Sequence, residues 1–208
     1  MIIAIDGPAA SGKGTLARRL AARYGLHHLD TGLTYRAVAS AMLKAHADLS
    51  DEELACTFAK QINLGGLERT VLAEHGIGEA ASRIAVMARV RAILVDRQKA
   101  FARQAPGAVL DGRDIGTVVC PAALVKFFVT ASADVRARRR YDEIIGNGGD
   151  IEFASVLADI ERRDMRDRSR SASPLTKADD AHLLDTSDLD IETALSYAVE
   201  IVESALNA

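Results

Sequence analysis

Residues 7–15 read Gly7-Pro8-Ala9-Ala10-Ser11-Gly12-Lys13-Gly14-Thr15, and the type of fold follows from them. This is a P-loop, a glycine-rich turn whose successive backbone N–H groups cradle phosphates. An apolar run predicts a buried strand over residues 2–5 before it, and an amphipathic pattern predicts a helix over 15–24 after it. An ordinary strand–helix turn would explain the glycines but not a lysine at this spacing, so we expect the whole loop to bind a nucleotide.

Two polar groups beside the loop are candidates for the phosphates and their metal. Lys13 is expected to reach the β- and γ-phosphates of a nucleoside triphosphate, and the Thr15 hydroxyl is expected to face Mg²⁺ or its waters. Asp111, after a predicted strand, could hold a water on Mg²⁺, although a turn residue at a strand end would look the same. The five histidines and two cysteines show no metal-ligand spacing, so no firm protein-held metal site is expected.

Apolar segments alternate with amphipathic ones along the rest of the chain. The expected elements are strands at 27–29, 108–110, 126–130 and 182–184, and helices at 33–47, 50–60, 79–104 (in one piece or two), 133–145, 151–168 and 191–206. Ser50 and Ser132 are the expected N-caps of two of these helices, and residues 62–78 look irregular. This alternation predicts an α/β fold, a P-loop NTPase-like parallel sheet flanked by helices.

The length of 208 residues suits one domain built from three parts. We expect a core (1–30, 106–132 and 171–208), an acceptor-binding insertion near 31–105, and a lid near 133–170. The net charge of −3 argues against a general nucleic-acid binder, which would need an excess of Lys and Arg.

The sequence also bears on compartment and partners. Cys56 and Cys120 are far apart and read as free, buried thiols of a reducing compartment. The N-terminus does not resemble a signal peptide, and no apolar run reaches the ~18 residues of a membrane span. We therefore expect a cytoplasmic monomer without membrane or nucleic-acid partners.

Five segments, in order and spread over nearly the whole chain, give a closer likeness. The Gly-Lys-Gly-Thr form, with a glycine between the lysine and the hydroxyl residue, is similar to nucleoside monophosphate kinases, and no Asn-Lys-x-Asp motif supports a switch-type GTPase. The set as a whole resembles bacterial cytidylate kinases: the P-loop, Leu29-Asp30-Thr31-Gly32-Leu33-Thr34-Tyr35-Arg36, Ala81-Ser82, Asp111-Gly112-Arg113-Asp114-Ile115-Gly116-Thr117 and Arg163-Asp164-Met165-Arg166-Asp167-Arg168-Ser169-Arg170. The resemblance implies phosphoryl transfer from Mg-ATP to CMP, with dCMP as a second acceptor.

Three residues have the chemistry to read a cytosine base. Cytosine presents an N4 amino donor beside the N3 and O2 acceptors, so a selective site needs one carboxylate and further donors. Asp114 can accept from N4, while Arg91 and Ser82 can donate, and the resemblance implies the same roles. Uracil has an oxygen in place of the amino group, so it would leave Asp114 unpaired and be rejected.

The arginines of the motifs suit the acceptor phosphate. Arg36, Arg113 and Arg163 are the expected clamp, because the planar guanidinium binds phosphate oxygens in pairs. Together with Lys13, Arg113 and Arg163 are the expected catalytic residues, acting by position and charge.

The resemblance further implies that Thr31, Asp167 and Arg170 contact the ribose. Residues 163, 166, 167 and 170 have the spacing of one helix face. Taken alone, that stretch could equally be a solvated face of alternating charge.

A basic helix before a glycine-rich loop is the candidate lid. Arg136, Arg139 and Arg140 share a face of the predicted helix, and the loop at 146–149 follows it. We interpret them as a lid that closes over ATP, with Arg139 on the nucleotide, although a basic solvent-exposed helix would give the same pattern. Tyr35 is expected to pack beside Arg36.

Two rival functions stay open at this point. One is a P-loop kinase for UMP or another small acceptor, which a panel of acceptors would separate from a CMP kinase. The other is a nucleotide sensor, which would bind ATP tightly without acceptor-dependent release of ADP.

Overall fold

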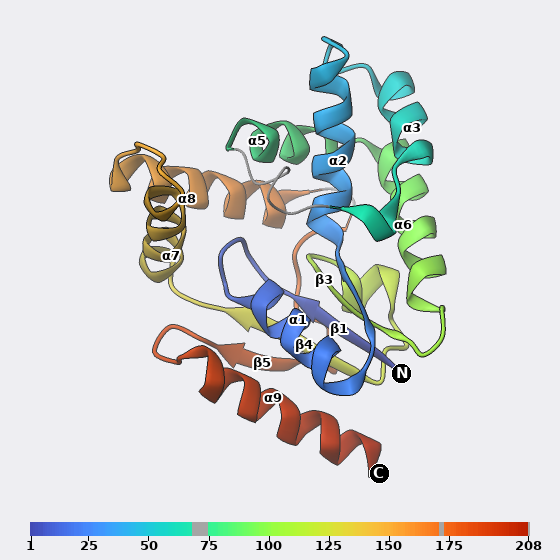
Figure 1. The fold of residues 1–208 in the computed structure, drawn as a ribbon, viewed down its shortest axis with the longest axis vertical. Coiled ribbons are helices and arrows are strands. Elements are labelled where there is room, and N and C mark those ends of the chain that lie inside the picture. The colour runs from blue at the N-terminus through green and yellow to red at the C-terminus, as the bar shows by residue number, and fades with distance from the viewer. Residues whose placement is uncertain (68–74, 171–172, 208) are drawn as a thin grey trace.

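A five-stranded parallel sheet forms the centre of the protein (Figure 1). The computed structural model describes residues 1–67, 75–170 and 173–207. The strands are β1 (Ile2–Asp6), β2 (His27–Asp30), β3 (Ala108–Gly112), β4 (Val125–Thr130) and β5 (His182–Asp185). Their order is β2-β3-β1-β4-β5, and every neighbouring pair is parallel. The predicted α/β class is therefore confirmed.

The sheet is buried on both faces, as the apolar runs predict. Alternate residues of β1 point to opposite sides: Ile3 and Ile5 join the core under one face, whereas Ala4 joins the core under the other. Ala4 lies opposite Leu110 of β3 in the parallel register. The sheet is therefore rigid at its centre, directly before the P-loop.

Helices cover both faces and form two further groups. They are α1 (Lys13–Tyr24), α2 (Thr31–Lys44), α3 (Glu52–Gln61), η1 (Leu64–Gly66), α5 (His75–Ile84), α6 (Ala88–Ala102), η2 (Ile115–Val119), α7 (Ala133–Gly146), α8 (Phe153–Ser169) and α9 (Ile191–Leu206). Helices α1 and α9 pack on one face of the sheet, and α6 and η2 pack on the other. Beyond the sheet, α2, α3, α5 and α6 share a separate apolar core around Val38, Met42, Ile84 and Leu94. The α7–α8 hairpin forms the other group, with a small apolar core of its own around Ala137, Val156 and Ile160 (Figure 1).

The predicted elements lie where the sequence placed them, with two local corrections. Residues 75–78, expected to be irregular, begin α5, because Ile77 and Ile84 form a buried stripe against α2 that outweighs the low helix propensity of glycine. The rest of that irregular segment includes residues 68–74, which lie outside the described residues. Ser50 does not cap α3; the carboxylate of Asp51 does, accepting from the Leu54 N–H, so the helix begins later. Ser132 caps α7 as predicted.

Both cysteines are buried, as expected for structural thiols. Cys56 lies in the helical core of α2, α3, α5 and α6, and Cys120 lies under the sheet after η2. In the described ranges, no helix has the length and apolar character to cross a membrane.

Arg136 differs from its expected place on the face of the lid that closes over ATP. Its side chain is 4% exposed and forms a two-bond ion pair with Asp164 of α8, at 3.0 and 2.6 Å. It also donates to the carbonyl oxygens of Ala131 and of Ala9 in the P-loop, at 2.8 and 3.3 Å. Arg136 therefore ties α7 to α8 and to the loop, rather than facing a ligand.

Loss of this buried pair is expected to destabilise the protein. Asp164→Ala would leave the Arg136 guanidinium buried without its partner, which costs about 3–5 kcal/mol. Urea unfolding measures this, with Asp159→Ala as control because Asp159 of the same helix is paired with the exposed Arg162. Similar unfolding free energies for the two variants would contradict the structural role of Arg136.

Candidate functional site

The candidate site lies where the strands end. In a parallel sheet all carboxyl ends meet at one edge, and ligands bind in the crevices there. The chain leaves β1 at Asp6, β2 at Asp30 and β3 at Gly112, and each of these points is followed at once by predicted site residues. The sheet thus gathers segments that are far apart in the sequence.

The P-loop has the backbone expected of an anion cradle. Its backbone adopts positive φ at Ala10 and Gly12, at 60° and 88°, which turns the chain into α1. Gly7 is required by close approach, since a Cβ there would lie 2.0 Å from the Val129 carbonyl oxygen. Ser11 Oγ is buried and has no hydrogen-bond partner among the described residues. A loop with open N–H groups and an unsatisfied hydroxyl suits a phosphate.

Lys13 is held under this loop rather than extended into solvent. Its ammonium donates to the Pro8 carbonyl oxygen at 3.0 Å. Burial lowers the pKa of Lys13 to about 7, and the positive charge of Arg113 contributes to the shift. Because burial disfavours the charged form of Lys13, a bound anion would stabilise that form strongly.

The hollow around the loop, which we call the loop pocket, also carries oxygen ligands. Thr15, Asp30 and Asp111 line it together with Lys13. Asp111 Oδ1 lies 2.9 Å from His28 Nε2. Among the described residues no group of three or more His, Cys, Asp or Glu side chains could hold a metal by itself. A magnesium ion that is bound mainly by phosphates and waters, with one or two carboxylates nearby, fits such a donor set.

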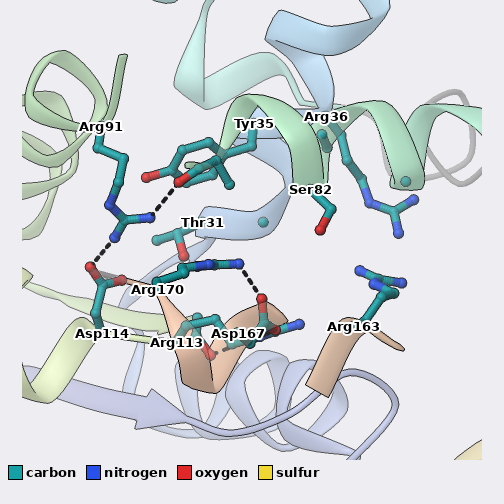
Figure 2. A pocket seen from close by; sticks show the side chains of 15 residues that line it. Thr31, Tyr35, Arg36, Ser82, Arg91, Arg113, Asp114, Arg163, Asp167 and Arg170 are labelled. Atoms are coloured by element: carbon teal, nitrogen blue, oxygen red, sulfur yellow. Dashed lines mark hydrogen bonds and ion pairs between the residues drawn. The ribbon is translucent and has the colours of Figure 1, made fainter. Parts of the chain in front are cut away.

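A second hollow lies between the helical group and α8, and we call it the inner pocket (Figure 2). It brings together every residue that the sequence proposes for the acceptor: Thr31, Arg36, Ser82, Arg91, Arg113, Asp114, Arg163, Asp167 and Arg170. In Figure 2, Arg91 and Asp114 lie at one end and Arg36 and Arg163 at the other. The pocket is therefore polarised along its length.

The first end is built around one ion pair. Arg91 and Asp114 are bonded to each other and nearly buried, and Arg91 also donates to the Ala85 carbonyl oxygen. The guanidinium carbon of Arg91 lies 5.7 Å from the ring centre of Tyr35, so Tyr35 packs on Arg91 and not beside Arg36 as predicted. Burial raises the pKa of Tyr35 to about 12, which keeps the phenol neutral. This end therefore offers charged and aromatic side chains to a ligand.

Asp167 organises the middle of the pocket. Arg113 Nε donates to Asp167 Oδ2 at 2.6 Å, and Arg170 donates to Oδ1. The Arg170 Nε is buried without a partner among the described residues. Thr31 Oγ1 donates its proton to the Asp111 carbonyl oxygen at 2.8 Å, so this hydroxyl can only accept from a ligand.

Cations crowd the passage between the two pockets, which we call the bridging cleft. Lys13, Arg36, Arg113, Arg140 and Arg163 line it, with fewer carboxylates among them. Burial, together with the positive charges of Arg113 and Arg36, lowers the pKa of Arg163 to about 10. In Figure 2 the guanidinium groups of Arg36 and Arg163 face each other. An anion between these cations would offset their mutual repulsion.

Sequence reasoning missed a fourth hollow, the side pocket, which opens beside α1. It is lined by Gly12, Thr15, Leu16, Val129, Arg139, Thr186, Leu189, Asp190, Ile191 and Ala194. Arg139 donates to Thr186 Oγ1 at 3.0 Å and to the Thr186 carbonyl oxygen at 2.6 Å. The turn after β5 therefore carries residues of the side pocket. In the sequence, the one indication of this is that the turn follows a strand of the core.

Asp6 is the second residue that sequence reasoning missed. Its buried carboxylate accepts from the N–H groups of Ile115 and Gly116, at 2.7 and 2.8 Å. These bonds fix the turn that presents Asp114. Burial raises the pKa of Asp6 to about 6 in spite of both bonds. In the sequence, the indication of this role is a charged residue at the end of an apolar strand, directly before the P-loop.

Comparison with known proteins agrees with this geometry. The family model described as cytidylate kinase matches residues 3–204. A cytidylate kinase of Rhizobium meliloti (strain 1021) is 59% identical over 99% of this chain and 97% of its own length. One from Agrobacterium fabrum is 60% identical over 98% and 97%. The crystal structure of an uncharacterized protein from Eubacterium ventriosum shares the fold, with a TM-score of 0.58, 15% identity and coverage of 98% and 99%.

The raised pKa of Asp6 predicts a pH-dependent stability. The folded pKa lies above the unfolded value, so this contribution is complete below about pH 4 and is lost as the pH rises through about 6. The loss amounts to about 3 kcal/mol. Asp6→Asn should remove this slope from urea unfolding measured between pH 4 and 7. Asp190→Asn is the control, because the exposed carboxylate of Asp190 caps α9 and its pKa is lowered, which is a shift in the direction opposite to that of Asp6. An unchanged slope in Asp6→Asn would refute the assignment.

Proposed function

The chain belongs to the cytidylate kinase family, so its reaction is transfer of the γ-phosphoryl group of ATP to CMP or dCMP, and from this premise we propose how its pockets divide the two substrates. One observation carries the proposal. The bridging cleft shares Lys13 with the loop pocket and Arg163 with the inner pocket, so it joins a phosphate-binding loop to a second pocket lined by polar and charged side chains. The γ-phosphate of the donor and the phosphate of the acceptor would meet in this cleft.

The donor occupies the loop pocket and the side pocket. Its phosphates lie on the loop from Gly7 to Thr15, with Lys13 on the β- and γ-phosphates. Its base enters the side pocket, where Leu16 and Leu189 supply apolar walls and Arg139 borders the opening. Arg139 and Arg140 then form the part of the lid that faces ATP.

Magnesium accompanies the donor phosphates. Bound there, it would neutralise charge on the β- and γ-phosphates. Thr15 and Asp111 are the residues that would hold it, through its water ligands, because both line the loop pocket and offer oxygen donors.

The acceptor occupies the inner pocket with its base at the Arg91–Asp114 end. Asp114 accepts from the N4 amino group, and Arg91 and Ser82 donate to the ring acceptors. Asp167, Arg170 and Thr31 contact the ribose; the Thr31 hydroxyl, which has given its proton to the protein, accepts from a sugar hydroxyl. Arg36, Arg113 and Arg163 clamp the phosphate at the other end.

The mechanism follows from this placement. A phosphate oxygen of CMP, already anionic, attacks the γ-phosphorus in line, and ADP leaves from the opposite side. No strong general base is required. Lys13, Arg113 and Arg163 stabilise the charge on the transferred group, and their fixed positions supply most of the rate enhancement. The lid near 133–170 excludes water, so that ATP is not hydrolysed.

We propose a monomer as the working unit. Its substrates are metabolites of the cytoplasm, where we place the enzyme in pyrimidine nucleotide metabolism. A kinase for UMP is disfavoured, since Asp114 would face an oxygen of uracil. A non-catalytic sensor has no evident need for the clamp arginines.

A panel of acceptors tests the function directly. ADP release from Mg-ATP is measured with CMP, dCMP, UMP, AMP and GMP in turn. Strong release with CMP and dCMP alone is the expected result. Release with another acceptor would keep the kinase and discard the cytosine site, and folded protein that binds ATP without any acceptor-dependent release would discard both.

Base choice is expected to depend on Asp114. Asp114→Asn replaces one carboxylate oxygen by an amino donor that clashes with N4 of cytosine and suits O4 of uracil. The ratio of kcat/KM for CMP over UMP should fall roughly a hundredfold, since an unpaired polar group in a closed site is costly. Thermal unfolding of the variant checks that loss of the Arg91 pair has not unfolded the pocket. A preserved CMP preference in a folded variant would disprove the base assignment.

Nucleotide binding should take up a proton through Lys13. At pH 8 a group of pKa about 7 is mostly neutral, and phosphates will raise that pKa. Calorimetry of Mg-ADP binding in buffers of different ionisation enthalpy should therefore show uptake of close to one proton at pH 8 and little at pH 6. In Lys13→Arg, which stays charged, binding should be weaker and free of this uptake. Equal uptake in both proteins would place the proton elsewhere.

A further inference from the structure

Arg166 has no part in the site described so far, yet it contacts one of its residues. It lies on α8, three residues beyond Arg163, and its Nη1 is 2.7 Å from Ser82 Oγ on α5. Its guanidinium also reaches both carboxylate oxygens of Glu79, at 3.0 and 3.3 Å. Arg166 therefore joins α8 to the helix that carries Ser82.

The chemistry of this contact fixes the direction of the hydrogen bond. A guanidinium has five donors and no acceptor, so Ser82 Oγ must be the acceptor. The hydroxyl proton then has to point elsewhere. Within the described ranges of the chain no protein acceptor receives it: the Arg166 bond is the one recorded for Ser82 Oγ. Since Ser82 is buried and lines the inner pocket, the O–H is left for a ligand.

Glu79 sets the position of Arg166. Its carboxylate and Ser82 Oγ lie one turn apart on α5, and the planar guanidinium spans both. The Arg166 side chain is 29% exposed and Glu79 is 50% exposed, so the ion pair itself is partly screened and contributes little to stability. The ion pair acts on orientation instead, because it holds the Arg166 guanidinium where it can donate to Ser82 Oγ.

We propose that Arg166 is a positioning residue of the acceptor site, which occupies a lone pair of Ser82 Oγ and thereby directs the Ser82 proton to an acceptor atom of the cytosine ring. This inference rests on the proposed function. Arg166 would act in binding of CMP and not in phosphoryl transfer, since it borders neither the bridging cleft nor the P-loop. A positively charged donor on Oγ also makes the remaining O–H a stronger donor.

A double-mutant cycle between Arg166 and Ser82 tests the proposal. Arg166→Ala should raise KM for CMP about tenfold, the cost of one misdirected hydrogen bond, and leave kcat within about twofold. In a Ser82→Ala background the same change should have no further effect, because the hydroxyl it orients is gone. Arg166→Lys keeps one charged donor and should recover part of the affinity.

The matched control is Arg162→Ala on the same helix. Arg162 is 64% exposed and paired with Asp159, so its loss should leave KM for CMP unchanged. Effects of Arg166→Ala that add to those of Ser82→Ala, or that lower kcat as much as they raise KM, would overturn the proposal and assign Arg166 to closure of α8 on α5. Absence of CMP phosphorylation by the unmodified protein would instead refute the proposed function, so the two failures are distinguishable.

Discussion

Buried positive charges meet where the strands of the sheet end, and the surrounding elements are arranged to hold them there. Lys13, Arg113 and Arg163 converge on one cleft. Burial and repulsion by Arg113 lower the pKa of Lys13 and of Arg163, whereas the pairing with Asp167 raises the pKa of Arg113 in spite of burial. Repulsion of this kind would open an ordinary surface. Here it is contained because each cation comes from a different rigid element: α1, the turn after β3, and α8. An anionic substrate then relieves a repulsion that folding has already imposed, and this makes the cleft selective for phosphate.

Carboxylates away from the cleft hold the charged groups in place. Asp167 fixes Arg113, Asp164 anchors α8 through Arg136, and Asp6 fixes the turn before η2. None of the three neutralises the cleft as a whole. Each restrains the backbone or side chain of a residue that faces the ligands, so the geometry is set before binding. Preorganisation of this kind lowers the cost of ordering the site when the substrates arrive.

The sequence was sufficient where one local signal determined the outcome. The P-loop, its flanking strand and helix, and the Arg163–Arg170 stretch could be read directly, because their spacing follows from helix and strand geometry. Three features could not be read. Arg136 looked like a lid residue because its helix position does not reveal Asp164 opposite it. Tyr35 packs on Arg91 through a fold-level contact. The start of α5 depends on packing against α2, which overrides its glycines. In each case the deciding partner is distant in the sequence.

Two hydroxyl groups in the inner pocket are oriented by hydrogen bonds to other protein groups, and this orientation affects which ligand atoms they can bind. Thr31 gives its proton to a backbone carbonyl and can only accept, whereas Ser82 accepts from Arg166 and keeps its proton to donate. A free serine or threonine hydroxyl could rotate to suit either donor or acceptor, and would discriminate poorly. By committing both hydroxyls in opposite senses, the pocket demands a donor at one point and an acceptor at another. In the proposed binding mode a ribonucleotide with a cytosine base presents both, and recognition would rest on the protein's own hydrogen bonds as much as on its direct contacts.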